Sequence, residues 1–109
     1  MTGDVLMRTM ATLANPHRLR VIAALSQGRN YVSQLARDLG ISRPLLQVHL
    51  RRLEAVGLVS SSLELSEDGK AMKFYELQPF EFCLTPTVVA ALAPTLTDEG
   101  AGDTGEGDR

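Results

Sequence analysis

The sequence predicts one mainly helical α+β domain with the element order α-α-α-α-β-β-α. Its 109 residues are 44% hydrophobic and 22% charged, which suits one soluble globular domain with a single small core. Apolar residues recur with a helical period up to Gly57, and strand-like alternation follows it. The chain can be divided into these elements because cap residues and prolines mark the predicted helix starts, and glycines mark several of the predicted ends.

Composition also excludes several classes of protein. The longest nearly uncharged stretch, residues 83–97, is interrupted by two prolines and is shorter than the ~20 apolar residues of a membrane span. Asp4 and Arg8 do not fit the charge order of a secretory signal, so a cytoplasmic protein is expected. The single cysteine, Cys83, excludes an intrachain disulfide and any multi-cysteine metal site.

The first two predicted helices meet at Asn15-Pro16. Leu6, Met10 and Leu13 have i, i+4, i+7 spacing, which predicts a helix ending near Ala14. Asn15 can cap a second helix that begins at Pro16, continues to about Gln27 and is closed by Gly28. Its predicted core face consists of Leu19, Ile22, Ala23 and Leu25.

The third and fourth predicted helices are joined by a very short turn. Asn30 is a plausible cap for the third, and Gly40 ends it. Ser42 can cap the fourth, which has Pro44 in its first turn and Gly57 as its stop. This pattern is typical of a helix-turn-helix: a small residue, a glycine in the turn, and apolar side chains between the two helices. These residues are Ala36, Gly40, Leu35, Leu39, Ile41 and Leu46. The second helix of that motif enters the DNA major groove.

The period changes after Gly57. The sequences LVSSSLEL and AMKFYEL flank the turn sequence SEDGK, and together they predict a β-hairpin, here named the wing. Phe80, Phe82 and Leu84 continue the alternation, so Cys83 is expected to be a small packed residue in a strand. Thr85 and Pro86 then open a last helix that ends near Ala93.

The fourth helix divides into two faces at about 100° per residue. Leu46, His49, Leu50 and Leu53 share the inner face, so His49 is expected to be packed and hydrogen-bonded rather than catalytic or metal-binding. On the outward face, arginine can bind guanine or phosphate, glutamine can bind adenine, and valine can contact a thymine methyl group. The predicted DNA contacts, including the helix N-terminus and two wing lysines, are Ser42, Arg43, Pro44, Gln47, Val48, Arg51, Arg52, Lys70 and Lys73.

Charge is unevenly distributed along the chain. The net charge is −2, but residues 1–93 carry +2 and residues 29–56 carry +3. We therefore expect a DNA-binding domain over residues 1–93 and a disordered acidic tail over residues 94–109. The tail could provide solubility, or it could compete electrostatically with non-specific DNA binding.

These motifs resemble one known family. Three segments resemble the ArsR/SmtB family of winged helix-turn-helix transcriptional regulators. They are LANPHRLRVI at residues 13–22, Ser42-Arg43-Pro44, and HLRRLEAVGLV at residues 49–59. The similarity covers about residues 6–77. It implies a homodimer that binds an inverted repeat and dimerises through its first and last helices. The implied dimer contacts are Leu6, Met10, Leu13, Val88, Val89 and Leu92.

The chain departs from the metal-sensing members of that family. Residues 31–40 lack the paired cysteines of one usual site, and residues 87–93 lack the acid and histidine ligands of another. No metal and no cofactor are therefore expected; the alternative is an unusual site built from His17, Cys83 or carboxylates.

The leading hypothesis is a sequence-specific DNA-binding homodimer. The acidic wing turn and acidic tail leave open a winged-helix protein-interaction module, and Cys83 leaves open a redox-responsive regulator. No nucleophile–base constellation, catalytic carboxylate pair or phosphate-binding glycine loop supports an enzyme. Any small-molecule effector is left open.

Overall fold

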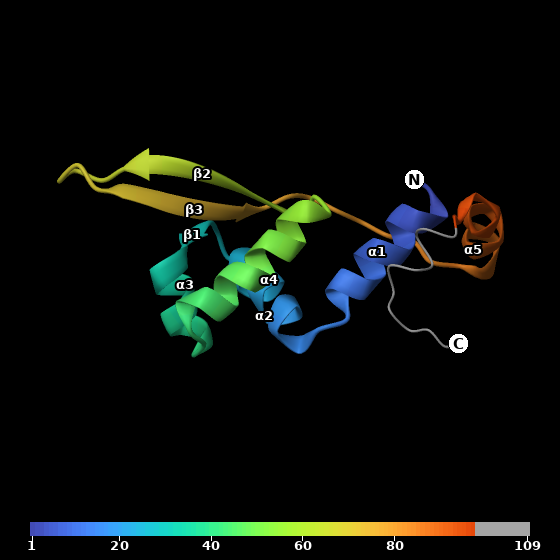
Figure 1. The fold of residues 1–109 in the computed structure, drawn as a ribbon, viewed down its shortest axis with the longest axis horizontal. Helices are drawn as coiled ribbons and strands as arrows, with labels where there is room; N and C mark the ends of the chain where they lie inside the picture. The colour runs from blue at the N-terminus through green and yellow to red at the C-terminus, as the bar shows by residue number, and fades with distance from the viewer. Residues whose placement is uncertain (98–109) are drawn as a thin grey trace.

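A computed structural model describes residues 1–97 of the chain (Figure 1). Its elements are α1 (Gly3–Leu13), α2 (Pro16–Leu25), β1 (Asn30–Tyr31), α3 (Val32–Leu39), α4 (Arg43–Ala55), β2 (Val59–Leu65), β3 (Ala71–Leu77), α5 (Pro86–Leu92) and the 3-10 helix η1 (Ala93–Thr95). The predicted helices and hairpin are therefore confirmed in their predicted order.

Side-chain caps begin the helices largely as the sequence indicates. Asn15, Ser42 and Thr85 each accept a hydrogen bond from a backbone N–H three residues later, and a proline lies in each following first turn. Gly40 ends α3 in the left-handed conformation with φ of 68°, which lets the chain turn into α4 within three residues. Thr2, which was not among the predicted caps, caps α1 through its side chain by accepting from Val5 N–H.

Asn30 is not the cap of α3. Tyr31 occupies the N-cap position without a side-chain hydrogen bond, while the Asn30 side chain accepts from the N–H of Tyr31. These two residues form β1, which pairs with β3 and makes a three-stranded antiparallel sheet of order β1-β3-β2. A two-residue strand has no detectable period, so the sequence predicts only the hairpin.

The strand expected to continue through Phe82 is not formed. β3 ends at Leu77, and residues 78–85 connect the sheet to α5 without regular structure. Cys83 in this connection is exposed, so the expectation of a packed cysteine is wrong. Pro79 lacks the N–H that a continuing ladder requires, and the chain leaves the sheet towards α1 and α5 (Figure 1).

The hydrophobic core lies between α2, α3, α4 and the inner face of the hairpin. Its fully buried side chains are Val21, Leu35, Leu46, Leu50 and Leu53. The predicted core face of α2 needs correction, because Leu19 is 54% exposed and Ala23 is also exposed. Val21 and Leu25, four residues apart, instead form the buried stripe of α2, and Leu19 lies about 200° around the helix from Val21.

The two terminal helices form a second packed unit beside this core (Figure 1). Gly3 N–H donates to Thr95 Oγ1 at 2.6 Å, and the Asp4 carboxylate accepts from Thr97 N–H at 3.0 Å and from Thr97 Oγ1 at 2.6 Å. Residues 94–97, which the sequence analysis assigned to the tail, therefore belong to the packed domain. The other predicted tail residues, 98–109, lie outside the described residues.

Replacing Gly3 with alanine should weaken this terminal unit. A Cβ on Gly3 would lie 2.6 Å from the backbone oxygen of Leu92 and 2.8 Å from the Leu96 side chain, so α1 and α5 would have to separate. We expect Gly3→Ala to lower the free energy of unfolding by about 1–3 kcal/mol in urea denaturation. Ala11→Ser, at an exposed position of the same helix, is the control, and equal stability of the two variants would contradict the close approach.

Candidate nucleic-acid interface

α4 presents a buried face and an exposed face, as the helical period predicts. Leu46, His49, Leu50 and Leu53 are buried, and they pack α4 into the domain. The opposite face is exposed apart from Gln47, which is partly buried; it comprises Arg43, Pro44, Val48, Arg51 and Arg52. Ser42 lies at the start of the helix, where its hydroxyl accepts from Leu45 N–H at 3.3 Å.

A groove of about 260 Å³ lies between the N-terminal half of α4 and the wing. Arg43 and Gln47 from α4 and Lys73 from β3 line it, so the structure brings these three predicted residues together. Its other lining residues are Tyr31, Val32, Ser33, Leu63, Ala71 and Met72. Arg51 and Arg52 lie further along α4, and Lys70 lies in the turn of the hairpin, so none of these three lines the groove.

The wing is less acidic towards this groove than its sequence suggests. Glu64 forms a two-point ion pair with Arg29, and its Oε1 accepts from Arg29 Nη2 at 3.0 Å. The hydrogen bond with Arg29 holds the pKa of the Glu64 carboxyl below its usual range. Because strand side chains alternate, Glu64 projects to the face opposite its neighbour Leu63, which lines the groove.

Arg29 joins the wing to the body of the domain, a role that was not predicted from the sequence. Its guanidinium lies 4.3 Å from the ring centroid of Phe74 on β3 while it binds Glu64 on β2. Its partner lies 35 positions along the chain, so no local pattern could indicate the pair. In the turn, Asp68 accepts from the Ser66 hydroxyl, and this bond is the main cause of the lowered pKa of its carboxyl.

His49 is packed and hydrogen-bonded, as expected. It is 5% exposed, and its Nδ1 accepts from Arg18 Nε at 3.1 Å. The His17 ring stacks on it with 5.4 Å between ring centroids. Burial lowers the pKa of His49, and the positive charges of Arg18, His17 and Arg52 lower it further.

Two kinds of feature are absent from the described part of the chain. Within residues 1–97, no group of three or more His, Cys, Asp or Glu side chains could hold a metal ion. None of the helices in that range is long and apolar enough to cross a membrane.

The short turn between α3 and α4, the adjoining hairpin and the basic outward face of α4 define a winged helix-turn-helix DNA-binding domain. Residues 15–61 match the sequence model of bacterial regulatory proteins of the arsR family. The uncharacterised HTH-type transcriptional regulator MJ0229 of Methanocaldococcus jannaschii is 34% identical over 80 residues, which cover 73% of this chain and 83% of that protein. The chain therefore belongs to the ArsR family of transcriptional regulators and is not an enzyme.

Other proteins are similar over different shares of their length. HTH-type transcriptional regulator CmtR of Mycobacterium tuberculosis is 39% identical over 64 residues, 59% of this chain and 54% of CmtR, so the match spans about half of CmtR. A solution structure from Mycobacterium bovis, the homodimeric winged helix-turn-helix DNA-binding domain Mb0332, has a TM-score of 0.61 at 22% identity and covers 94% of this chain and 82% of that chain. Reduced HlyU from Vibrio cholerae has a TM-score of 0.58 at 23% identity, with 83% of each chain covered. These structural similarities confirm the winged helix-turn-helix fold.

The environment of His49 predicts a loss of stability in acid. Because its pKa is lowered in the folded protein, the unfolded chain binds more protons in the pH range below about 6.5. The contribution of neutral His49 is therefore complete above about pH 6.5 and declines as the pH falls towards its folded pKa. Urea denaturation at several pH values should show this decline in the wild type and a smaller one in His49→Asn, whose amide oxygen can accept a hydrogen bond without titrating. Equal pH dependence in both proteins would contradict the assignment.

Proposed function

We propose that the chain acts as a homodimer that binds an inverted-repeat operator by inserting α4 of each subunit into the major groove. The observation that carries this proposal is the division of α4 into a buried apolar face and an exposed face with three arginines and a glutamine. A helix held in this way presents its outward side chains to base edges at fixed positions.

The groove beside α4 supports different roles for its polar residues. Arg43 and Gln47 line the groove from the helix, where their side chains can bind guanine or phosphate and adenine respectively. Arg51 lies on the same outward face, and Val48 can contact a thymine methyl group. Lys73 lines the groove from the wing and, with Lys70 and Arg52, is suited to phosphate. The Ser42 end of α4 adds backbone N–H groups that favour a phosphate, and Pro44 completes the exposed first turn.

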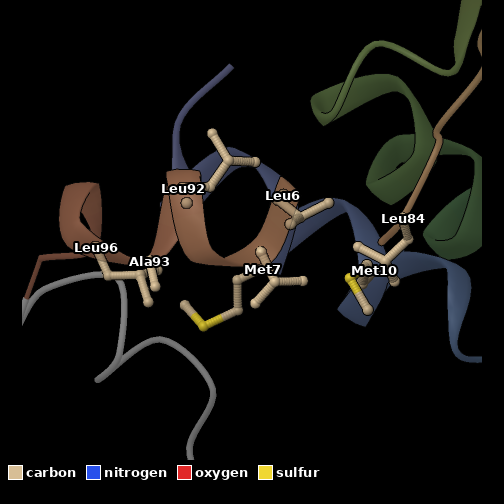
Figure 2. Close-up of a pocket in the computed structure, with 9 residues that line it drawn as sticks. Leu6, Met7, Met10, Leu84, Leu92, Ala93 and Leu96 are labelled. Atoms are coloured by element: carbon tan, nitrogen blue, oxygen red, sulfur yellow. The ribbon is translucent and has the colours of Figure 1, made fainter. Parts of the chain in front are cut away.

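The apolar face of α1 and α5 supports dimerisation with a second copy. A hollow of about 270 Å³ is lined by apolar side chains of α1 and α5 and by Leu84. Figure 2 shows how Leu6, Met7 and Met10 of α1 lie relative to Leu84 and Leu92. Met10 is 46% exposed and Val89 is 45% exposed, so a substantial apolar surface is available to a partner. All six proposed contacts, Leu6, Met10, Leu13, Val88, Val89 and Leu92, line this hollow or the neighbouring one.

The proposed regulator carries no metal at the two positions implied by its family resemblance. Residues 31–40 have no cysteine, and residues 87–93 have no ligating side chain. Glu64 of the wing is paired with Arg29, whereas the acidic turn that motivates the alternative of a protein-interaction module contains Glu67 and Asp68.

Selection from randomised duplexes tests the proposed base reading. The wild type should enrich an inverted repeat with half-sites about one helical turn apart. Gln47→Ala or Arg51→Ala should cost roughly 1–3 kcal/mol on the selected site and relax its sequence, because each would remove a base contact. Lys73→Ala should weaken all sequences about equally. Uniform loss from Gln47→Ala would contradict base reading, and salt-independent or absent DNA binding would contradict the proposed function.

Sedimentation tests the proposed dimer surface. Val89→Asp places a charge on the apolar face of α5, so the variant should become monomeric and bind the inverted repeat much more weakly. Leu65→Asp is the matched control for oligomeric state, because Leu65 is 75% exposed and lies on the wing instead of this face. A dimeric Val89→Asp protein would contradict the assigned surface.

A further inference from the structure

Arg18 connects three helices through one side chain. It belongs to α2, its Nη1 donates to the backbone oxygen of Thr12 in α1 at 3.1 Å, and its Nε donates to His49 Nδ1 in α4 at 3.1 Å. One planar group therefore relates the C-terminal end of α1 to the middle of α4.

His49 depends on this contact for its hydrogen bonding. Because Nδ1 accepts from Arg18, the proton of the neutral ring is on Nε2, and Nε2 is buried without a hydrogen-bond partner among residues 1–97. The hydrogen bond from Arg18 is therefore the polar contact that this buried ring makes within the described residues. The stacked ring of His17 covers it from α2.

His49 also lies directly behind the proposed base-reading residues. Gln47 precedes it by two positions and Arg51 follows it by two, so both project from the opposite side of the same helix. A shift or rotation of α4 at His49 would move both side chains together relative to the rest of the subunit. The buried leucines beside His49 hold α4 against the core by packing, which has little directional preference. The hydrogen bond to His49 depends on angle as well as distance, so it also restrains the rotation of α4 about its axis.

We propose that Arg18 is a positioning residue that fixes α4 relative to α1 and thereby sets the distance between the two recognition helices of the dimer. The proposal rests on the proposed function, in which α1 belongs to the dimer interface and α4 reads DNA. α1 also contacts α4 directly, and Arg18 adds hydrogen bonds from one side chain to both helices, which couple the position of α1 to that of α4. Arg18 would then act on operator spacing without contacting DNA.

The test is binding to a set of duplexes in which the selected half-sites are separated by spacers of different lengths. The wild type should prefer one spacer. Arg18→Met keeps the length of the side chain but neither hydrogen bond, so the ratio of its affinities for the preferred and the other spacers should be about tenfold smaller. Arg18→Lys, which keeps the charge but not the fork of donors, should lie between them. Arg20→Met is the matched control, because Arg20 is exposed on α2 and makes no hydrogen bond or ion pair with any described residue.

Three further measurements distinguish positioning from other roles. The half-site sequence, the dimeric state and the dependence of affinity on salt should be unchanged in Arg18→Met, measured at a temperature at which circular dichroism shows both proteins folded. A lower melting temperature with wild-type spacer preference would show a merely structural role and overturn the proposal. A salt slope reduced by about one would instead place Arg18 on a phosphate, which also overturns it.

Failure of the proposed function gives a different result. A wild-type protein that enriches no inverted repeat would overturn both the proposed function and the role of Arg18. A wild type that prefers one spacer, together with folded Arg18→Met and Arg18→Lys variants that keep the same preference, would overturn the role of Arg18 alone.

Discussion

The burial of one face of α4 is the constraint on which the rest of the domain depends. Leu46, Leu50 and Leu53 are fully buried against α2, α3 and the hairpin. Burying three leucines contributes roughly 1.5–3 kcal/mol each from apolar transfer, so the helix has one strongly favoured orientation. Once that face is fixed, the helical period alone decides which residues are exposed. The outward position of the proposed DNA contacts on α4 is therefore a consequence of core packing.

Local chemistry explains why most of the fold could be predicted from the sequence. Asn15, Ser42 and Thr85 act within three residues of themselves, and Gly40 acts on its own backbone, so their effects are visible in short stretches. The errors occur where tertiary contacts decide the outcome. Val21 is buried because it lies in the core that α2 shares with α3, α4 and the hairpin, and Cys83 is exposed because the chain leaves the sheet after Leu77.

The same distinction applies to the candidate site. The outward face of α4 follows from its sequence, but the groove that unites Arg43, Gln47 and Lys73 depends on how the hairpin packs beside the helix. Arg18 and its acceptor His49 are 31 positions apart, and Arg29 and Glu64 are 35 positions apart. Sequence periodicity places each residue on its own element but does not show which elements meet. Both arginines connect elements of the domain that lie far apart in the sequence.

The two exposed surfaces of this chain have different chemistry and complement each other in a dimer. A single recognition module of this size buries about 600–1,000 Å² on DNA, which limits both its affinity and the length of sequence it reads. Covering the apolar face of α1 and α5 with a second copy would supplement a small core and, through two-fold symmetry, present two copies of α4 to one operator. The two-fold symmetry of such a dimer requires inverted half-sites but does not determine the distance between them. In the proposed dimer, that separation would depend on how rigidly α4 is held relative to α1, so a hydrogen bond inside the domain could affect DNA selectivity.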